Sequence, residues 1–370
     1  MKVLMISSEY PPVIHGGLGR YMQGLVSPLA QKLSALSLLT APHPECEAKE
    51  VMGNLAVSRP AIAGTPENLM DWVMQFNFAS CESVLKEGLD FDLIHVHDWL
   101  AAPAGIALKE LAKVPLIASF HATEKGRKEM LLSEQEHAIA SIESDLAKKA
   151  EQIIVCSEYM KRTVQHEFGV QNAAVIRSGN AWSAFGQNKT EDGGYVFAMG
   201  RFVKEKGFGD LIKAFSSIHV NYPGIRLLLA GEGPLKDEYM QQAKELGVSE
   251  KLLLPGFLEG EALIRTVDAA HICVIPSLYE PFGLSALECM GRGKSVLSSS
   301  AGGLEELIIH QETGLLFEGG DEAGLVAGME QLLQDTALRE KLAAAALKES
   351  LHYTWGRAAG EMYSIYSKML

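Results

Sequence analysis

No stretch of the 370-residue sequence is apolar for long enough to cross a membrane. Its hydrophobic runs fall well short of the ~20 residues that a membrane-spanning helix needs. The first ten residues contain one basic residue and too few consecutive apolar residues for a secretory signal. The sequence therefore predicts a soluble, cytoplasmic protein without a transmembrane segment.

Cysteine is also scarce. The five cysteines, at positions 46, 81, 156, 273 and 289, lie far apart and show neither a Cys-x-x-Cys pair nor the spacing of zinc ligands. Cys156 and Cys273 fall in apolar runs, where a free thiol behaves as a small hydrophobic group. We expect free thiols, as in a reducing compartment, and no zinc site.

Positive charge is in deficit, because 33 Lys and Arg residues face 46 Asp and Glu residues, for a net charge of −13. This balance argues against binding to a polyanion and predicts no nucleic-acid partner. The remaining composition is that of an ordinary globular protein, with 47% hydrophobic and 21% charged residues. A chain of 370 residues is longer than one core usually supports, so two domains are expected.

Apolar strand-like runs alternate with helical patterns along the chain, which predicts the α/β class with parallel sheets covered on both faces. A polar segment at residues 181–194, rich in Gly, Ser, Asn and Thr, is the expected linker. It divides a first domain, residues 1–180, from a second domain, residues 195–350. Residues 42–66 show no clear period, and residues 124–149 read as one charged, solvated helical stretch.

The expected strands define where ligand loops gather. In the first domain they are Val3–Ile6, Ala35–Thr40, Asp92–Val96, Pro115–Phe120, Gln152–Ser157 and Ala173–Arg177. In the second domain they are Tyr195–Met199, Arg226–Ala230, Lys251–Leu254, His271–Ile275, Ser295–Ser299 and Gly314–Phe317. Right-handed crossovers place all loops that follow parallel strands along one edge of the sheet. Each domain is therefore expected to collect its ligand-binding loops at that edge.

The most informative stretch runs from His271 to Gly293, where a buried strand leads through a loop into a helix. The free N–H groups of the first helical turn, near Phe282 to Ser285, form a site for an anion. Two carboxylates, Glu280 and Glu288, frame this turn and would repel a bare phosphate. A nucleotide sugar, which offers hydroxyls as well as negative charge, fits both features.

The run Glu-Pro-Phe-Gly-Leu-Ser-Ala-Leu-Glu resembles the Glu-x7-Glu signature of retaining glycosyltransferases of family four. The resemblance implies the GT-B fold, with two Rossmann-like domains, the donor held mainly by the second and the acceptor mainly by the first. It also implies that residues 351–370 form a terminal helix that crosses back to the first domain, although an ordinary packed helix is the alternative. By the same resemblance, Glu280 contacts the donor sugar and Glu288 the nucleotide ribose, with donor contacts also at Phe282, Gly283 and Leu284.

Two cations follow the first strand of the second domain, in Gly-Arg-Phe-Val-Lys-Glu-Lys-Gly. Arg201 and Lys206 can point at one ligand from the start of a helix, where fixed cations stabilise a departing diphosphate in place of a metal ion. The element resembles the Gly-Arg and Lys-Gly pair of the same family. We therefore expect catalysis without a metal or other cofactor.

Glycine-rich turns are the other expected donor contacts. Gly16 and Gly17 belong to a Gly-Gly-Leu-Gly loop that resembles the loop of the glycogen and starch synthase branch, where it faces the donor phosphates. In the second domain, Gly231 and Phe257 follow strands, and Gly303 belongs to a loop that resembles the family's Gly-Gly-x-Pro-Glu. These loops complete the nucleotide edge that the resemblance implies.

His121 directly follows a predicted strand and resembles the family histidine that approaches the donor sugar. His95 and His97 lie two apart on one strand, but without a third ligand a packed or hydrogen-bonded pair is the better interpretation. The sequence Asp90-Phe91-Asp92 matches a metal-binding Asp-x-Asp motif only in form, because it lies at the start of a strand, away from the ligand edge. Neither pattern predicts a metal site.

Together these features predict a metal-independent retaining glycosyltransferase that moves a hexose, with glucose favoured, from a nucleotide-diphosphate sugar to a hydroxyl acceptor such as a glucan or other polysaccharide. A nucleotide-sugar epimerase on the same plan is one alternative, and the Glu-x7-Glu stretch counts against it. The other is a degenerate protein that binds glycan or nucleotide sugar in an assembly or coat. An altered hinge sequence at Arg177–Ala181 and a short connection at Gln31–Leu36 support that second alternative.

Overall fold

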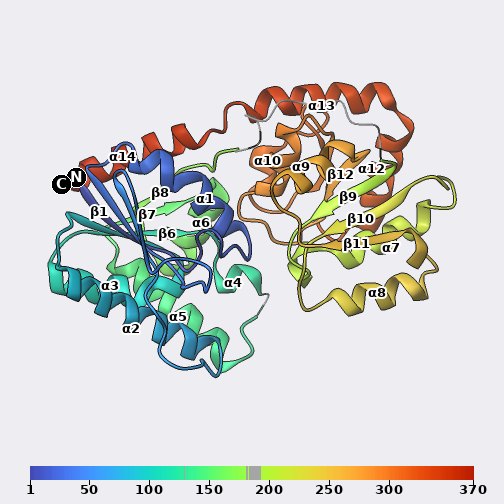
Figure 1. Cartoon of the computed structure of the whole chain (residues 1–370). Coiled ribbons are helices and arrows are strands. Elements are labelled where there is room, and N and C mark those ends of the chain that lie inside the picture. The colour runs from blue at the N-terminus through green and yellow to red at the C-terminus, as the bar shows by residue number, and fades with distance from the viewer. Residues whose placement is uncertain (129, 181, 183–192) are drawn as a thin grey trace. The chain divides into compact units, whose positions relative to one another are not determined.

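The computed structural model describes residues 1–128, 130–180, 182 and 193–370 (Figure 1). The chain forms two compact units, one made of Met1–Gly179 with Trp355–Leu370 and the other of Asn180–Thr354. The predicted boundary at residue 180 lies one residue from this division. Most of the predicted linker lies outside the described residues. No helix in the described parts of the chain combines the length and apolarity needed to span a membrane.

The first unit is built on an eight-stranded sheet in the order β3-β4-β2-β1-β5-β6-β7-β8. Its strands are β1 (Lys2–Ile6), β2 (Ala35–Leu39), β3 (Lys49–Met52), β4 (Leu55–Ser58), β5 (Leu93–His97), β6 (Leu116–Phe120), β7 (Gln152–Val155) and β8 (Ala173–Val175). All neighbours are parallel except β3 and β4, which form an antiparallel hairpin at one edge. The sequence analysis missed this hairpin because β3 has no buried residue, and alternation in β4 spans only four residues.

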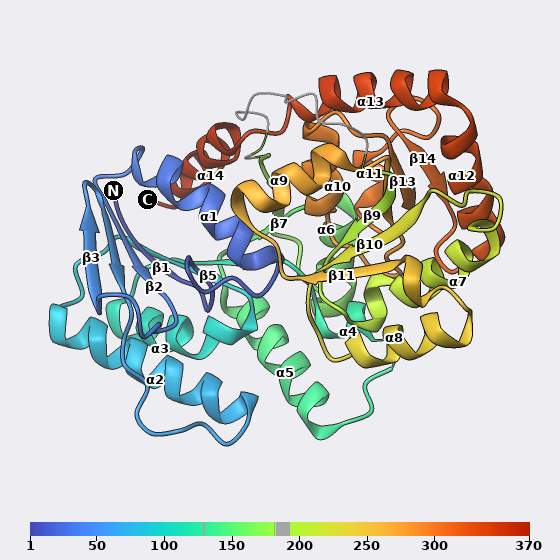
Figure 2. The same ribbon diagram turned by 45° about the vertical axis from the view of Figure 1, so that its right-hand side comes forward.

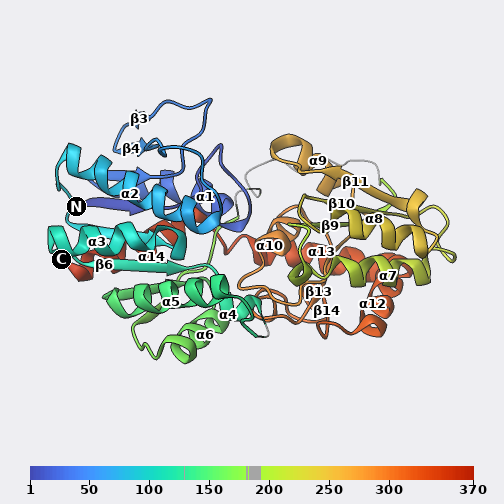
Figure 3. The same cartoon turned by 90° about the horizontal axis from the view of Figure 1, so that it is seen from below.

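Helices cover both faces of this sheet. They are α1 (Gly17–Ala30), α2 (Leu69–Glu87), α3 (Ala102–Ala112), α4 (Glu124–Arg127), α5 (Glu134–Lys149), α6 (Glu158–Phe168) and α14 (Trp355–Met369). Within the first unit, α1 and α14 lie on one face and α2, α3 and α5 on the other (Figures 1 and 3). The single helical stretch predicted for 124–149 is wrong, because Ser133 and Glu136 form a capping box that starts a new helix.

The terminal helix α14 packs on α1 inside the first unit. Trp355, Met362 and Tyr366 of α14 are buried in the same core as Leu25 and Leu29 of α1. Residues 351–354, which were predicted to belong to the terminal helix, lie instead in the second unit. The last helix of the chain is therefore part of the core that supports β1 and β2.

Gly24 of α1 has no room for a side chain, because an added Cβ would lie 2.0 Å from the Trp355 ring. We expect Gly24→Ala to destabilise the first unit by about 1–3 kcal/mol, the usual cost of overpacking. Gly360→Ala in α14 is the control, since its Cβ would meet no atom within 4 Å. Chemical unfolding of both variants measures the difference, and equal stabilities would contradict the packing.

The second unit is built on a six-stranded parallel sheet in the order β11-β10-β9-β12-β13-β14. Its strands are β9 (Tyr195–Met199), β10 (Arg226–Ala230), β11 (Leu252–Gly256), β12 (Ile272–Ile275), β13 (Val296–Ser299) and β14 (Leu315–Phe317). The six predicted strands are confirmed to within two residues at each end. The strand order reverses between β9 and β12, which creates the crevice where open α/β sheets bind ligands.

The helices of the second unit are α7 (Phe208–Ile218), α8 (Lys236–Glu245), α9 (Gly260–Ala269), α10 (Leu284–Gly291), α11 (Leu304–Leu307), α12 (Glu322–Gln334) and α13 (Thr336–Ser350). Within this unit, α7 and α8 lie on one face of the sheet and α9 and α10 on the other (Figures 1 and 2). Phe208, Phe215 and Tyr239 anchor the core beneath α7 and α8. The predicted class, two α/β domains on parallel sheets, is confirmed.

Candidate functional site

An ion pair joins the two loops at the point where the strand order of the second unit reverses. Lys206 ends the short turn that follows β9, and Glu280 lies in the loop that follows β12. The Lys206 Nζ is 2.7 Å from the Glu280 Oε2. The Ser277 hydroxyl donates to the same carboxylate oxygen over 3.2 Å. The Glu280 side chain is only 11% exposed, so its carboxylate is held in one place by two donors.

The backbone around Glu280 is equally constrained. The carbonyl of Glu205 accepts the N–H of Leu278 at 2.8 Å, which ties this loop to the loop after β9. Gly303 donates its N–H to the Glu280 carbonyl at 2.8 Å. An added Cβ on Gly303 would lie 2.3 Å from the Pro281 carbonyl oxygen, so only glycine permits this approach. Gly303 therefore supports the Glu280 loop directly.

Arg201 is held far more loosely than Lys206. Its guanidinium is 48% exposed, and one nitrogen lies 3.4 Å from the Glu205 carboxylate. An exposed pair at this separation contributes little to stability. Arg201 can therefore turn from Glu205 toward an incoming anion at small cost, whereas Lys206 starts from a fixed position.

The helix that carries Glu288 begins later than predicted. It starts at Leu284 with Gly283 at the N-cap, so Phe282 lies in the preceding loop rather than in the first turn. Gly283 has a φ of 106° and supplies no capping side chain, which leaves the first-turn N–H groups without a cap from that residue. Glu288 is half-buried inside this helix. The helix therefore presents its first N–H groups near the Glu280 loop, and an anion bound there stays a prediction.

The glycine turn at Gly231 has a structural explanation of its own. Gly231 has a φ of 147°, and its added Cβ would lie 1.9 Å from the Gly200 carbonyl oxygen. The residue is therefore required for packing between the loops after β10 and β9. Phe257, which follows β11, is 46% exposed and offers a free aromatic surface. A donor contact at either residue stays a prediction.

In the first unit, the half-buried His121 follows β6 and stacks on His97, which is buried together with His95. The backbone N–H of His121 donates to Asp98 Oδ1 over 2.7 Å, and its ring Nε2 lies 3.0 Å from His97 Nδ1. Asp98 has a φ of 57°, a strained conformation for a residue other than glycine that is common at functional sites. The Tyr21 ring packs edge-on against His121.

His95 continues the same cluster, with hydrogen bonds to the Tyr366 hydroxyl at 2.6 Å and the Ser119 hydroxyl at 2.8 Å. Burial lowers the pKa of His95 to about 3. Burial also lowers the pKa values of His97 and His121, although Asp98 and Glu9 partly oppose the shift of His121. The prediction that His95 and His97 are a packed or hydrogen-bonded pair is confirmed, because their ring centroids lie 4.3 Å apart and each imidazole has a hydrogen-bond partner. All three imidazoles are neutral near pH 7.

The glycine loop before α1 is occupied by a carboxylate from its own unit. Glu9 Oε2 accepts the N–H groups of His15, Gly16 and Gly19 at 2.9, 3.2 and 3.0 Å. This carboxylate takes the position of an anion at the helix N-terminus. A donor phosphate at Gly16 and Gly17 would therefore compete with Glu9, and the predicted contact there remains untested.

Metal-binding patterns are weak in the described residues. Asp90 pairs with the Lys2 Nζ at 2.7 Å, and Asp92 accepts the backbone N–H of Lys2 at 2.7 Å. The two aspartates of the Asp-x-Asp sequence therefore hold the start of β1 in place. No group of three His, Cys, Asp or Glu residues in the described ranges is arranged to bind a metal ion.

Sequence reasoning missed three residues that position the candidates. Ser277 holds Glu280, Glu205 links the two switch-point loops, and Asp98 holds the segment of His121. Ser277 and Asp98 both follow a strand at its carboxyl end, so the rule that ligand sites gather there could have found them. Glu205 acts through its backbone carbonyl, which no side-chain pattern reveals.

A buried acid also supports the His121 segment. Glu143 of α5 is 2% exposed, and its two oxygens lie 3.0 and 3.1 Å from the N–H of Glu124. Burial raises the pKa of Glu143 to about 8, although the Glu124 N–H opposes this. Because the pKa of Glu143 is higher in the folded state than in the unfolded chain, the protonated carboxyl stabilises the folded state. This contribution to the free energy of unfolding is complete below pH ~4.5 and is lost as the pH rises through about 8.

We expect Glu143→Gln to remove this decrease in stability at high pH, because glutamine cannot ionise. The unfolding free energy of the variant should fall less between pH 5 and pH 9 than that of the wild type, as measured by chemical unfolding across the series. Exposed Glu134 on the same helix gives the control variant Glu134→Gln. Parallel pH profiles for wild type and Glu143→Gln would contradict the assignment.

Comparisons with known proteins identify the family of this chain. Residues 15–179 match the family model described as Glycosyltransferase Family 4, and residues 182–349 match that of Glycosyl transferases group 1. The chain is 33% identical over 395 aligned residues to the glycogen synthase of Mycobacterium tuberculosis strain H37Rv. That alignment covers 99% of this chain and 94% of the relative.

Solved structures share the fold along the whole chain. Sucrose-phosphate synthase from Thermosynechococcus elongatus has a TM-score of 0.87 at 24% identity, with coverage of 100% of this chain and 98% of the other. Anabaena HepE in complex with UDP-glucose has a TM-score of 0.80 at 18% identity, with full coverage of both chains. The chain therefore belongs to glycosyltransferase family 4 and has the GT-B fold.

Proposed function

We propose that this glycosyltransferase is a retaining hexosyltransferase that works without a metal ion. It takes glucose from a nucleotide-diphosphate sugar and transfers it to a hydroxyl group of a glucan. The observation that carries the proposal is the ion pair between Lys206 and Glu280 at the switch point, with Ser277 on the same carboxylate. A fixed cation and a fixed carboxylate, side by side, suit a ligand that offers phosphate and sugar hydroxyls together.

The reaction breaks the bond between the sugar C1 and the β-phosphate oxygen and forms a bond from C1 to the acceptor oxygen. Lys206 and Arg201 stabilise the negative charge that develops on the departing diphosphate, which is the role of preorganised cations in a transition state. The proton of the acceptor hydroxyl passes to an oxygen of the leaving phosphate. No protein nucleophile is required on this route.

The remaining residues orient the donor. Glu280 accepts hydrogen bonds from hydroxyls of the sugar, and the N–H groups of Gly283, at the N-cap, and Leu284, in the first turn, donate hydrogen bonds to the sugar nucleotide. Glu288 accepts hydrogen bonds from the ribose hydroxyls. The contribution of His121 to the donor sugar stays a prediction from the family resemblance, as do those of Gly16 and Gly17.

The choice of glucose and glucan rests on the relatives. A glycogen synthase is 33% identical over nearly the full chain, and a protein of the same fold was solved with UDP-glucose. The relative that makes glycogen and the neighbour that binds UDP-glucose favour a glucosyl donor and a polysaccharide acceptor. The Gly-Gly-Leu-Gly loop of the first unit favours the same branch.

The configuration at the transferred carbon tests the retaining mechanism. Purified enzyme, an α-linked nucleotide-diphosphate glucose and a maltooligosaccharide acceptor should yield an α-linked product, as followed by proton NMR of the anomeric signal. Addition of EDTA should leave the rate unchanged. A β-linked product would rule out retention, and loss of activity that returns with a divalent cation would rule out metal independence.

A further inference from the structure

A direct hydrogen bond joins the imidazole rings of His97 and His121 in the first unit. His97 Nδ1 lies 3.0 Å from His121 Nε2, and the ring planes are inclined by 15°, so an N–H of one ring can point at the lone pair of the other. Burial lowers the pKa values of both histidines, so each ring is neutral near pH 7 and carries one proton. Two arrangements are therefore open, with either His97 or His121 as the donor.

The second nitrogen of His97 distinguishes the two arrangements. The His97 side chain is fully buried, and its Nε2 has no hydrogen-bond partner among the described residues. His95 packs beside it but offers no free nitrogen, because its Nδ1 and Nε2 contact the hydroxyls of Tyr366 and Ser119. If His121 donated to His97, the proton of His97 would lie on the buried Nε2 as an N–H without an acceptor.

The reverse arrangement leaves no unpaired N–H in the core. When His97 donates from Nδ1, its Nε2 holds only a lone pair, and buried acceptors with an unused lone pair are more common in proteins than buried N–H groups without an acceptor. His121 then accepts at Nε2 and carries its own proton on Nδ1, because the hydrogen bond of one ring nitrogen determines the state of the other. The burial of His97 thus selects the tautomer of His121.

The Nδ1 atom is the nitrogen of His121 that a ligand can reach. It makes no hydrogen bond to any described residue and, unlike His97 Nε2, it is not buried. The residue lies half-buried after the carboxyl end of β6, the edge where open α/β sheets bind ligands. A neutral imidazole with its proton on Nδ1 can donate a hydrogen bond there but cannot accept one.

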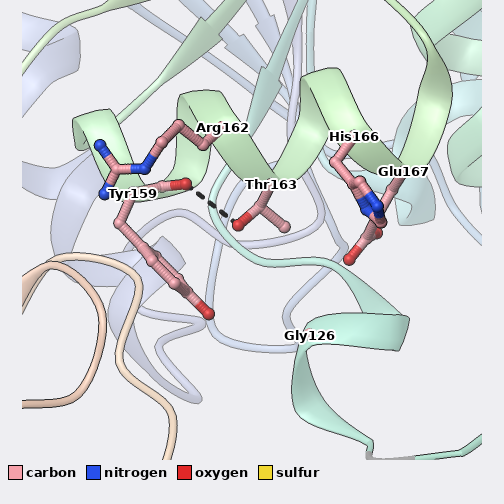
Figure 4. Close-up of a pocket in the computed structure, with 6 residues that line it drawn as sticks. All are labelled: Gly126, Tyr159, Arg162, Thr163, His166 and Glu167. Carbon is pink, nitrogen blue, oxygen red and sulfur yellow. Dashed lines mark hydrogen bonds between the residues drawn. The ribbon is translucent and has the colours of Figure 1, made fainter.

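The surroundings of His121 hold its ring and its segment in place. The Tyr21 ring packs edge-on against it, with the ring centroids 4.5 Å apart. Two residues later, Thr123 donates its hydroxyl to Glu167 over 3.2 Å and accepts the N–H of Gly126 at 3.0 Å. Figure 4 shows Glu167 on α6 and Gly126 in α4, which both line the pocket between these helices. With the ring held in this way, the position of its proton decides which ligand atoms it can bind.

We propose that His97 is a positioning residue that fixes the proton of His121 on Nδ1, so that His121 donates a hydrogen bond to a hydroxyl oxygen of the donor sugar. The inference rests on the proposed function and on the predicted approach of His121 to that sugar. It gives His121 no role as a general base, because Nδ1 already carries a proton and Nε2 is occupied by His97. His97 itself is buried and touches no substrate.

Two-bond proton–nitrogen correlation NMR of the full-length protein, with ¹⁵N-labelled histidine, tests the tautomer without any turnover. The wild type should show His121 as a neutral ring protonated on Nδ1, with its signals assigned by their loss in His121→Gln. His97→Asn keeps an N–H donor near the position of Nδ1 and should retain this tautomer. His97→Phe keeps a ring without a donor and should shift the proton of His121 toward Nε2. Exposed His137 of α5 gives the control His137→Asn, which should leave the His121 signals unchanged.

Kinetics with ADP-glucose and UDP-glucose tests the contact with the sugar. His97→Phe should lower kcat/KM for the donor about tenfold, the scale of one lost hydrogen bond, and leave the acceptor KM unchanged. His97→Asn should recover most of this loss, because it restores the donor to His121. A merely structural role of His97 would not produce this split or this rescue. Thermal melts verify that each variant is folded.

The outcomes separate this inference from the proposed function. Protonation of wild-type His121 on Nε2 or on both nitrogens would overturn the inference, even in an enzyme that transfers glucose. An unchanged tautomer or an unchanged donor kcat/KM in His97→Phe would overturn it as well. A wild type with the proton on Nδ1 that transfers no glucose from any donor would overturn the proposed function alone.

Discussion

Glu280→Ala lowers turnover by about two orders of magnitude or more, the scale expected when one preorganised transition-state contact is removed. The carboxylate is nearly buried and is held by Lys206 at 2.7 Å and by Ser277 at 3.2 Å. Removal of Glu280 takes away the sugar contact and leaves Lys206 without its counter-charge. The loss should therefore appear in kcat as well as in kcat/KM, as measured by nucleotide release at saturating donor.

A second site variant and a surface control variant accompany this measurement. Arg201→Ala should lower turnover by a similar factor, because it removes a cation that stabilises the departing diphosphate. This holds although Arg201 is loosely held in the unliganded protein. Glu261→Ala removes an exposed carboxylate, 80% accessible, from a surface pair with Arg265, and it should keep full activity. Near-normal turnover of Glu280→Ala, with a fold that matches the wild type, would remove Glu280 from the reaction.

Arg292→Ala destabilises the second unit by about 3–5 kcal/mol, because it leaves a buried carboxylate unpaired. Arg292 follows α10 and makes two hydrogen bonds to Asp268, from Nε at 2.7 Å and from Nη2 at 2.6 Å. The two side chains are 1% and 5% exposed. Asn180 fixes the same region from the chain entering this unit, with its Nδ2 donating to the Leu287 carbonyl at 3.0 Å.

The matched control is the double variant Arg292→Met with Asp268→Leu, which replaces both charges by apolar groups. It should recover most of the lost stability, because a buried pair and a hydrophobic pair of similar size often have similar free energies. Chemical unfolding of the wild type, the single variants Arg292→Met and Asp268→Leu, and the double variant measures the coupling. Loss of less than about 1 kcal/mol in Arg292→Ala would contradict the buried pair.

Most of the fold could be predicted because buried parallel strands are short apolar runs. Strands such as β9 and β12 are fully buried and stand out in the sequence as short, uninterrupted apolar segments. The β3–β4 hairpin could not be found in this way, since the residues of β3 face solvent. The break before α5 depends on a local capping box, whose signal was hidden within a continuous charged helical pattern.

The candidate site was predictable in its charged side chains but not in its supports. Residue spacing indicated Lys206 and Glu280, and strand order explains why they meet. The support from Gly303, by contrast, depends on a backbone approach to Pro281 that requires the folded loops. The sequence predicts a donor contact at Gly231. The structure adds a packing reason for glycine at this position, because a side chain there would clash with the Gly200 carbonyl.

Nucleotide release from a panel of UDP-, ADP- and GDP-sugars tests the central claim most directly. The purified full-length chain is assayed with chelator present, with and without a glucan acceptor. We predict that the acceptor stimulates release from one glucose donor and that Glu280→Ala abolishes this stimulation. Conversion of a donor without any acceptor would indicate an epimerase, and saturable nucleotide binding with no release from any donor would contradict the assignment as an active glycosyltransferase.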